Sequence, residues 1–581
     1  STLTMQLARL MYRLNTRSPW GKAKQAGLAV WLELRYSKRE ILEAYLNLVP
    51  FGGNVQGVGA ASRIYFSKGP ERINLGEALT LAVIPQSPSK RVSQEASLLR
   101  ARRALGELWL QRRWFWGDRE AERRQVELEV GAKAEHGMPQ FAPHFVDALL
   151  AQQGRRGGRV ETSLDAGLQR VVERQIRGFV GQYGERGIRN VSALLVDHRD
   201  MSVRAWVGSS DFRDASIDGQ VNGVLAKRSP GSTLKPFVYA LAMDQGLLHP
   251  QTILKDAPTS FGPYSPENFD GRFFGPITAE QALIRSRNVP AAGVASRLRR
   301  PSLYQFLQSA GVSRLESEEH YGLALALGGG ELTMEELVGL YAMLANGGEL
   351  RPVETLKKRR KVEGVRLLSA EASFVTLDML RKNPTPSEGG ELASRGRWTV
   401  AWKTGTSWGF RDAWSVGVVG PYVLAVWIGN FGGEGNPSFV GVDAAAPLFF
   451  RLVDALNLAR PNEEVPMRKV PEGVKRIAVC AASGELPNVH CPNTVETWYI
   501  PGKSPIRVSQ LHRAVAMDVV SGKPVCPPFA VENVRWEVFE FWGSDVLKQF
   551  REAGLPRRRA PEMPDCLNGA QGDAPKIASP L

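Results

Sequence analysis

The sequence lacks a long hydrophobic run. Hydrophobic residues make up 43% of the 581 residues, but no uninterrupted apolar stretch reaches the roughly 18 residues that a membrane-spanning helix needs. The most apolar stretch, residues 416–428, is broken by Gly420 and Pro421, which is typical of two strands joined by a turn. The chain begins with Ser1 instead of Met, and no signal peptide is recognisable. The lack of an anchor in this sequence therefore excludes nothing about the complete protein.

Cysteine is scarce and confined to one end of the chain. All four cysteines, Cys480, Cys491, Cys526 and Cys566, lie in roughly the last hundred residues. An even number of cysteines clustered at one end, with none in the rest of the chain, is typical of an exported protein in which disulfides stabilise one region. Proximity favours a Cys480–Cys491 disulfide, with Cys526–Cys566 as the remaining pair. Zinc binding is the alternative because His490 adjoins Cys491, although no paired C-x-x-C spacing is present.

Charge is ordinary in amount but unbalanced. The 74 Lys and Arg residues against 59 Asp and Glu residues give a net charge of +15, and 23% of residues are charged. This composition excludes disordered and collagen-like proteins. The positive charge favours an anionic partner, either nucleic acid or a phospholipid surface. The basic run at residues 357–361 lies beside Arg351-Pro352 and is interpreted as a solvated loop. Because no nucleic-acid recognition motif is present, we expect no nucleic-acid binding.

The length suggests roughly three to four domains. Residues 1–115 have the periodicity of helices, with a capping box at Ser37–Glu40. Residues 116–160 are polar and rich in Arg, and are predicted to be a linker. Residues 161–457 alternate strand and helix patterns, with a second capping box at Thr333–Glu336, which predicts an α/β domain with an antiparallel sheet and a helical interior. Residues 458–581 gain Pro, Gly and Cys and are predicted to form a small β-rich module.

The motif Ser232-Thr-Leu-Lys235 carries a nucleophile and a base. It precedes Pro236 and an apolar helical run. Proline is tolerated in the first turn of a helix, so a helix is predicted to start near Ser232. A spacing of three places the hydroxyl and the amine on one face, within reach of each other. A lysine with an ordinary pKa is a poor base at neutral pH, but burial and a second cation can lower that pKa until the amine accepts the serine proton.

A second motif, Ser286-Arg287-Asn288, follows a predicted helix over residues 278–284. Its serine hydroxyl can relay a proton between Lys235 and a second lysine. Asn288 can bind a substrate amide. Alone, such a tripeptide is common by chance, and it gains meaning only from its position after the Ser232 motif.

The third motif ends a predicted strand in which Trp398, Val400 and Trp402 alternate. It consists of Lys403, Thr404, Gly405 and Thr406. Such a strand offers an edge to an extended peptide, the glycine lets the peptide backbone approach closely, and the lysine with the threonines can hold a carboxylate. In this order, the three motifs predict a serine acyl-transfer site.

The order of the three motifs resembles that of the penicillin-binding transpeptidases. The surrounding segments agree with the resemblance: Thr162–Asp165, Pro266–Asn268, Leu325–Gly330 and Trp427–Asn430. The resemblance implies an oxyanion hole made by the backbone N–H groups of Ser232 and Thr406. It also implies that the substrates are D-Ala-D-Ala stem peptides and that β-lactams acylate Ser232.

The start of the chain resembles the peptidoglycan glycosyltransferase that precedes the transpeptidase in class A penicillin-binding proteins. Residues 1–9, 22–24, 40–47 and 57–68 match its second to fifth motifs in order. The resemblance implies a mostly helical, lysozyme-like fold that binds lipid II through the pyrophosphate. The implied substrate-binding residues are Ser1, Thr2, Gln6, Arg9, Lys22 and Gln25. A divalent cation such as Mg²⁺ is an implied cofactor of this part, and no cofactor is implied for the transpeptidase.

The glycosyltransferase part departs from the family pattern in two ways. The first motif, which holds the catalytic glutamate, is not found in the sequence, and Gln25 occupies the position of the usual second glutamate. That glutamine and the cysteine-bearing C-terminal region are similar to the 1C branch of the class A family. The ending Pro575–Pro580 suits that branch and the start of a further β-sandwich domain. The resemblance further implies an extracytoplasmic protein of the inner membrane, anchored by a transmembrane helix outside this sequence, with other cell-wall enzymes as partners.

The expected function is therefore that of a bifunctional peptidoglycan synthase, with glycosyltransferase and serine-type D,D-transpeptidase activities. A D,D-carboxypeptidase or a β-lactamase shares all three motifs and differs in using water as the acyl acceptor. A penicillin-binding scaffold or sensor without turnover is the non-enzymatic alternative. The glycosyltransferase part favours cross-linking over both.

Overall fold

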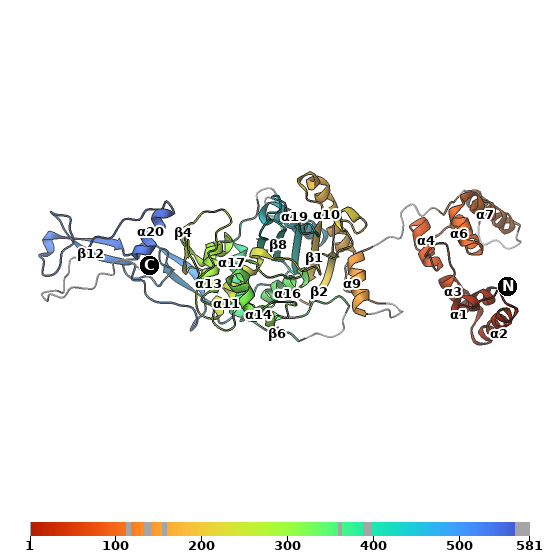
Figure 1. Ribbon diagram of the computed structural model, residues 1–581, viewed down its shortest axis with the longest axis horizontal. Helices are drawn as coiled ribbons and strands as arrows, with labels where there is room; N and C mark the ends of the chain where they lie inside the picture. The colour runs from red at the N-terminus through yellow and green to blue at the C-terminus, as the bar shows by residue number, and fades with distance from the viewer. Residues whose placement is uncertain are drawn as a thin grey trace. The chain divides into compact units, whose positions relative to one another are not determined.

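The computed structural model describes residues 2–111, 118–128, 130–132, 141–153, 160–357, 363–386 and 398–563. The chain divides into two compact units, residues 1–141 and residues 142–581 (Figure 1). No helix in the described part of the chain is long and apolar enough to cross a membrane.

The first unit is helical, as its sequence predicts. Its helices are α1 (Leu3–Tyr12), α2 (Pro19–Arg35), α3 (Lys38–Leu48), α4 (Val58–Phe66), α5 (Leu75–Val83), α6 (Pro88–Ser93), α7 (Glu95–Leu110) and α8 (Arg119–Glu127). The predicted capping box starts α3: the Glu40 carboxylate accepts from the Ser37 N–H at 2.8 Å, and the Ser37 hydroxyl accepts from the Glu40 N–H at 3.3 Å. Leu7, Leu32 and Ile41 pack α1, α2 and α3 together.

The second unit is built around a five-stranded antiparallel sheet with the strand order β2-β1-β9-β8-β7. The strands are β1 (Val191–Asp197), β2 (Ser202–Val207), β7 (Val400–Thr406), β8 (Asp412–Val419) and β9 (Tyr422–Gly429). The predicted strands are confirmed, and the interrupted apolar stretch is indeed two strands joined at Gly420-Pro421. Since β7 is an edge strand, one side of the third motif has no partner in this sheet.

Both faces of this sheet are covered by helices. On one face, alternate residues such as Val191, Leu195 and Val426 pack against α10 (Ala166–Tyr183) and α19 (Ala446–Ala459). The other face packs against the helical interior, which contains α11 (Lys235–Asp244), α16 (Met334–Ala345) and α17 (Ala370–Arg381) (Figure 1). Because successive side chains of a strand point to opposite faces of the sheet, the same strands contribute to two separate hydrophobic cores.

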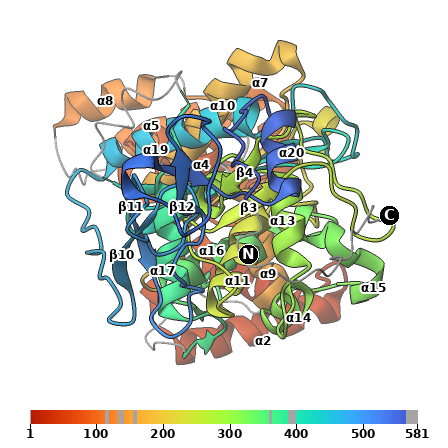
Figure 2. The same ribbon diagram turned by 90° about the vertical axis from the view of Figure 1, so that its left-hand side faces the viewer.

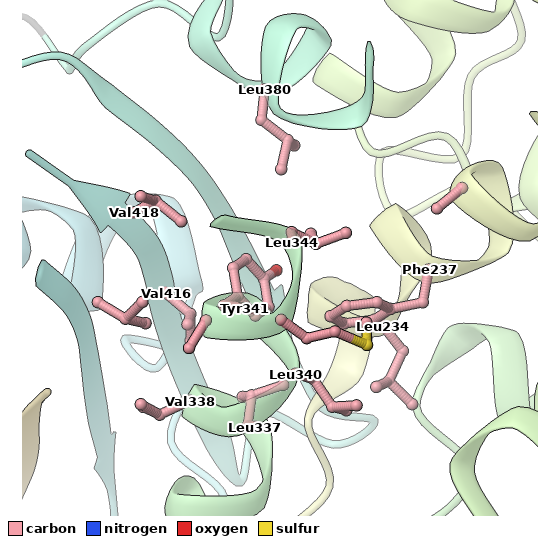
Figure 3. Close-up of a cluster of buried hydrophobic side chains, with 14 of the residues drawn as sticks. Leu234, Phe237, Leu337, Val338, Leu340, Tyr341, Leu344, Leu380, Val416 and Val418 are labelled. Carbon is pink, nitrogen blue, oxygen red and sulfur yellow. The ribbon is translucent and has the colours of Figure 1, made fainter. Parts of the chain in front are cut away.

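The core on the helical side holds the motif around Ser232 in place. Figure 3 shows Phe237 of α11 and Tyr341 of α16 pointing toward each other, with Val416 and Val418 of β8 on one side. The rings of Phe237 and Tyr341 lie 5.4 Å apart in an edge-on arrangement. Leu234 and Phe237 are both completely buried. The residues on either side of Lys235 are therefore fixed by apolar packing.

The remaining helices and short strands of the second unit surround this core. They are α9 (Pro143–Gln153), α12 (Ala279–Ile284), α13 (Asn288–Ala295), α14 (Leu303–Ser309), α15 (Glu318–Tyr321), β3 (Ile253–Asp256) paired with β4 (Gly275–Thr278), and β5 (Glu349–Leu350) paired with β6 (Val365–Arg366). The predicted capping box at Thr333 and Glu336 starts α16.

The C-terminal module consists of two separate hairpins and a helix (Figure 2). Strands β10 (Lys475–Cys480) and β11 (Thr494–Tyr499) form one hairpin, and β12 (His512–Asp518) and β13 (Val534–Glu540) form the other. The helix α20 (Ser544–Glu552) was not expected from the sequence. A disulfide joins Cys480 and Cys491, whose Cα atoms are 6.0 Å apart, as their proximity predicts. The second predicted pair includes Cys566, which lies outside the described residues.

Candidate active site

The nucleophile motif lies in a tight turn directly against the edge strand. Ser232 belongs to a 3₁₀ turn, Gly231–Leu234, which continues into α11. Gly231 has φ +52°, and a Cβ atom on it would lie 2.6 Å from the Thr406 carbonyl oxygen. A Cβ atom on Gly405 would collide with the Pro230 carbonyl oxygen. The two glycines therefore allow the serine turn and β7 to touch backbone to backbone.

Hydrogen bonds to buried groups hold this turn rigid. Tyr341 donates its hydroxyl proton to the Thr233 carbonyl at 2.9 Å, and Trp414 donates its indole N–H to the Ser229 carbonyl at 2.9 Å. The Ser229 hydroxyl donates to the Gly328 carbonyl at 2.7 Å. The turn is thus tied to α16, β8 and the loop before α16, so the Ser232 backbone has little freedom to move.

The two motif lysines converge on the serine of the second motif. Lys403 Nζ donates to Ser286 Oγ at 2.7 Å and to the Thr404 carbonyl at 2.9 Å. Lys235 Nζ lies 3.4 Å from the same Ser286 Oγ and donates to Asn288 Oδ1 at 2.6 Å. Ser286 has φ +58°, a conformation that is costly for a residue other than glycine and that clusters at functional sites. Ser286 Oγ therefore lies between the amines of Lys235 and Lys403, as expected for a proton relay.

The surroundings of the lysines favour the neutral amine. Lys235 is completely buried, and burial, then the charges of Lys403 and Arg287, lower its pKa well below the usual value, while Asp256 opposes the shift. Burial also lowers the pKa of Lys403 to about 7. A neutral Lys235 at neutral pH has a free lone pair, which is the requirement for a general base.

The predicted contact between Ser232 and Lys235 is not formed in this structure. Among the described residues, Lys235 Nζ donates hydrogen bonds to the Ser286 carbonyl at 2.5 Å, to Ser286 Oγ and to Asn288 Oδ1. The amine thus sits one turn along from the Ser232 hydroxyl but is directed at the second motif. Catalytic hydrogen bonds are often long or misaligned without substrate and tighten in the complex, so this geometry is compatible with a base role.

A buried network behind the second motif was missed from the sequence. Arg287 Nε donates to Asp256 at 2.8 Å, and its Nη1 donates to Asp270 at 2.9 Å. Asp256 also accepts from the Asn268 amide at 2.7 Å, and Asn268 Oδ1 accepts from the Asn288 N–H at 2.8 Å. The network therefore connects the end of β3 to the start of α13 and positions both Ser286 and Asn288. The sequence held one indication of this network: Arg287 is a charged residue between Ser286 and Asn288, so a buried motif would require an acidic partner for it.

The third motif presents its open edge beside the nucleophile. The Ser407 N–H donates to the Asp412 carbonyl at 2.9 Å, which makes the odd-numbered residues of β7 the ones that bond β8. The backbone groups of Thr404 and Thr406 therefore point away from β8, toward the unpaired edge. The Thr406 hydroxyl accepts from the Gly441 N–H at 2.9 Å, so this side chain anchors the loop after β9. The backbone of Thr406 is left to face a ligand, together with that of Ser232.

The predicted glycosyltransferase residues lie on α1 and α2 of the first unit. Thr2 caps α1 by accepting from the Met5 N–H at 3.2 Å, and Gln6 accepts from the Tyr45 hydroxyl at 3.2 Å. Arg9 and Lys22 are exposed. Gln25 is 5% exposed and donates its amide to the Met5 carbonyl at 2.7 Å, so it ties α2 to α1 instead of facing solvent. Ser1 lies outside the described residues.

Comparison with known families accounts for most of the chain. Residues 1–108 match the family model "Transglycosylase", residues 191–440 match "Penicillin binding protein transpeptidase domain", and residues 470–514 match "Penicillin-binding protein 1A, C-terminal domain". The second match contains all three motifs around Ser232. The chain belongs to the class A penicillin-binding proteins.

Individual relatives agree with this assignment. The chain is 36% identical over 526 residues to penicillin-binding protein 1C of Escherichia coli (strain K12), covering 87% of this chain and 65% of the relative. It is 30% identical over 466 residues to penicillin-binding protein 1F of Bacillus subtilis (strain 168), covering 74% of this chain and 63% of the relative. The chain thus spans a little less than two thirds of the length of these relatives.

A solved structure supports the fold class. The crystal structure of penicillin-binding protein 1A from Haemophilus influenzae aligns with a TM-score of 0.59 at 17% sequence identity, covering 87% of this chain and 94% of that chain. The predicted fold class is confirmed: a helical N-terminal part, a transpeptidase domain with an antiparallel sheet and helices, and small C-terminal β modules.

Proposed function

We propose that the second unit is a serine D,D-transpeptidase of peptidoglycan synthesis, and that the first unit belongs to a glycosyltransferase that polymerises lipid II. The observation that carries the transpeptidase proposal is the position of Ser286 Oγ between the amines of Lys235 and Lys403. This relay lies beside a rigid serine turn and an open strand edge, which together provide a nucleophile, a base and a peptide-binding surface.

The acylation step follows from these groups. A stem peptide ending in D-Ala-D-Ala lies along the open edge of β7, with its carboxylate near Lys403 and its threonine neighbours. Ser232 Oγ attacks the carbonyl carbon of the penultimate D-Ala while Lys235 Nζ accepts the hydroxyl proton. The negative oxygen of the tetrahedral intermediate accepts hydrogen bonds from the backbone N–H groups of Ser232 and Thr406.

The relay completes the reaction. The C–N bond to the terminal D-Ala breaks, and its amine takes a proton that passes from Lys235 through Ser286. An amine from a neighbouring stem peptide then attacks the carbonyl carbon of the Ser232 ester and loses a proton to Lys235 by the same path. The C–O bond to Ser232 breaks, and Ser232 Oγ takes that proton back. A β-lactam presents a carbonyl and a carboxylate in the same places, so it acylates Ser232 but has no departing amine to make room for an acceptor.

Two measurements test this proposal. Fluorescent penicillin followed by peptide mapping identifies the acylated residue, and label on a peptide without residue 232 contradicts the assignment of the nucleophile. Incubation with a D-Ala-D-Ala peptide and an amine acceptor then separates cross-linking from hydrolysis. Hydrolysis as the dominant outcome at saturating amine favours a D,D-carboxypeptidase, and labelling without any peptide product favours a scaffold or sensor.

The surface of α2 supports a membrane location for the first unit. Trp20 is 80% exposed, Leu34 is 84% exposed, and Trp31 is 44% exposed on this helix. Exposed aromatic and aliphatic side chains next to lysines such as Lys22 are typical of helices that lie in the membrane interface. We therefore propose that α2 lies against the cytoplasmic membrane, where lipid II is available. Flotation with phospholipid vesicles tests this, and undiminished binding after Trp20→Ala and Leu34→Ser would contradict it.

The disulfide supports an extracytoplasmic location, because disulfides persist in oxidising compartments. A divalent cation such as Mg²⁺, implied by the family, is a proposed cofactor of the glycosyltransferase. No three acidic, His or Cys side chains gather there among the described residues. Glu33 is held by Thr4 and Lys38, and Glu40 by its capping box. We therefore derive no step through a cation.

A further inference from the structure

The C-terminal module brings three metal-ligating side chains together. Sγ of Cys480, Sγ of Cys491 and a ring nitrogen of His512 all lie within 4.8 Å of one another, and no other such group occurs in the described residues. Cys480 ends β10, Cys491 lies in the loop that follows it, and His512 begins β12 of the other hairpin. The disulfide joins two of these groups within one hairpin and leaves the imidazole against it.

The orientation of His512 is that of a metal ligand. Its ring is 3% exposed, Nδ1 lies 3.5 Å from Cys480 Sγ, and Nε2 lies 3.6 Å from a Glu540 carboxylate oxygen. The carboxylate favours the proton on Nε2, which directs the Nδ1 lone pair at the sulfur. A disulfide sulfur has no proton to donate to this lone pair. Imidazoles that bind metals generally have a carboxylate partner at their other ring nitrogen, and Glu540 lies on that side of His512.

The distance between ligands also fits. Tetrahedral zinc with Zn–S bonds of about 2.3 Å and Zn–N bonds of about 2.05 Å separates sulfur and nitrogen ligands by about 3.6 Å. The observed separation of Cys480 Sγ and His512 Nδ1 is 3.5 Å. Glu540 is itself fixed, because Trp542 donates its indole N–H to the second carboxylate oxygen at 2.7 Å. Asn488 holds the His512 backbone by donating to its carbonyl at 2.8 Å.

We propose that, when the Cys480–Cys491 disulfide is reduced, these two cysteines and His512 form a site for a thiophilic divalent cation such as Zn²⁺. A dithiol reductant transfers two electrons and two protons to the S–S bond and becomes a disulfide itself. Binding of the cation then releases the two thiol protons, and water completes the four-coordinate site. Re-oxidation to the disulfide expels the cation, so the two states exclude each other.

The two states have different consequences for the module. The disulfide closes a loop within the β10–β11 hairpin alone. A cation bound to His512 as well would connect that hairpin to the β12–β13 hairpin, which belongs to a separate sheet. Small modules with little core depend on such staples. The redox state of one cysteine pair would therefore decide whether a metal bridge reinforces the hydrogen bond that Asn488 already makes between the two hairpins.

The test uses the full chain with Cys526→Ser and Cys566→Ser, so that only the cluster thiols remain. After reduction with a phosphine and anaerobic desalting, we expect one Co²⁺ per chain, with the sulfur-to-cobalt charge-transfer absorption of thiolate ligation, and displacement by Zn²⁺. The oxidised protein is expected to bind none. Labelling of Ser232 by penicillin provides the check that each protein is folded.

Matched variants separate this site from incidental thiol binding. His512→Ala is expected to weaken Co²⁺ binding at least tenfold, and Glu540→Gln to weaken it about 10–100-fold through the second ring nitrogen. His490→Ala is the control, since His490 adjoins Cys491 in the chain but is not one of the three clustered residues. The proposal is overturned if the reduced protein takes up no cation, or if His512→Ala and His490→Ala bind it equally well.

Discussion

The buried ion pair behind Lys235 gives a stringent test of how this site sets its base. The Arg287 side chain is 5% exposed and the Asp256 side chain is not exposed at all. Arg287→Met removes the cation with little change of volume and leaves a buried carboxylate without its ion partner. Breaking a buried pair in this way costs about 3–5 kcal/mol. Because Asp256 keeps its bonds from Asn268 and from the Phe274 N–H, we expect a loss near the lower limit, about 3 kcal/mol.

The same substitution changes the pH dependence of acylation in a defined direction. Arg287 is one of the cations that lower the pKa of Lys235, after burial and Lys403. Without its charge the pKa of Lys235 rises, the neutral amine forms only at higher pH, and the acidic limb of the acylation profile moves to higher pH. Asp256→Asn removes a charge that raises the pKa of Lys235, so its acidic limb is expected to move to lower pH.

Stopped-flow measurement of acylation by a fluorescent penicillin across the neutral pH range locates the acidic limb of the pH–rate profile. Urea unfolding measures the free energy of unfolding. Arg285→Met is the matched control, because Arg285 contacts the same Phe274 ring but is exposed. Asp256→Asn combined with Arg287→Met removes both charges and is expected to recover much of the stability. If Arg287→Met leaves both stability and the acidic limb as they are in Arg285→Met, Arg287 does not tune Lys235 and the electrostatic account is wrong.

Five further outcomes are expected. Ser232→Ala abolishes covalent labelling by penicillin, while Lys235→Ala lowers the acylation rate about 10²–10⁴-fold by removing the base; persistent label in Ser232→Ala would refute the mechanism. Lys403→Ala slows acylation, because it weakens carboxylate binding and raises the pKa of Lys235. A raised half-saturating β-lactam concentration and an acidic limb at higher pH would reveal these two effects. Gly405→Ala forces a Cβ atom onto the Pro230 carbonyl, and thermal unfolding should show a loss of about 1–3 kcal/mol with slower acylation. The polypeptide of residues 1–581 is expected to form no glycan chains from lipid II, because Gln25 cannot ionise to act as a base; polymerisation at the rate of a longer chain would contradict this.

Local sequence signals predicted the elements that carry the site. The capping boxes at Ser37 and Thr333 predicted the starts of α3 and α16, because cap hydrogen bonds depend on residues three apart. Pro236 indicated a helix start, and the structure places a 3₁₀ turn there that continues as α11. The motif order predicted that Ser286 lies between two lysines, since each motif sits on an element whose type was recognisable from its pattern.

What the sequence could not give are contacts between distant elements. Asp256 lies 31 residues from Arg287, and nothing in the local pattern of either residue marks them as partners. The direction of Lys235 Nζ toward Asn288 depends on how α11 and α13 pack, and spacing within one helix does not determine it. The family resemblance implied that Gln25 binds substrate, but the contact between α1 and α2 buries it. Helix capping is local, whereas burial is a property of the assembled fold.

The arrangement at Ser286 also explains why the site has two lysines instead of one. A hydroxyl carries one proton and two lone pairs, so Ser286 Oγ can accept from both amines at once and still has its own proton to donate. The ordinary charged state of both lysines would leave Lys235 without a lone pair. Burial lowers both pKa values, and the charge on Lys403 lowers that of Lys235 further, which favours a neutral Lys235. Lys403 donates to Ser286 Oγ at 2.7 Å, which holds the hydroxyl beside Lys235 before substrate binds and leaves the lone pair of a neutral Lys235 for the Ser232 proton. In the proposed reaction, Lys235 takes the proton of Ser232 and then passes a proton to Ser286 while the Ser286 hydroxyl gives its own proton to the departing amine.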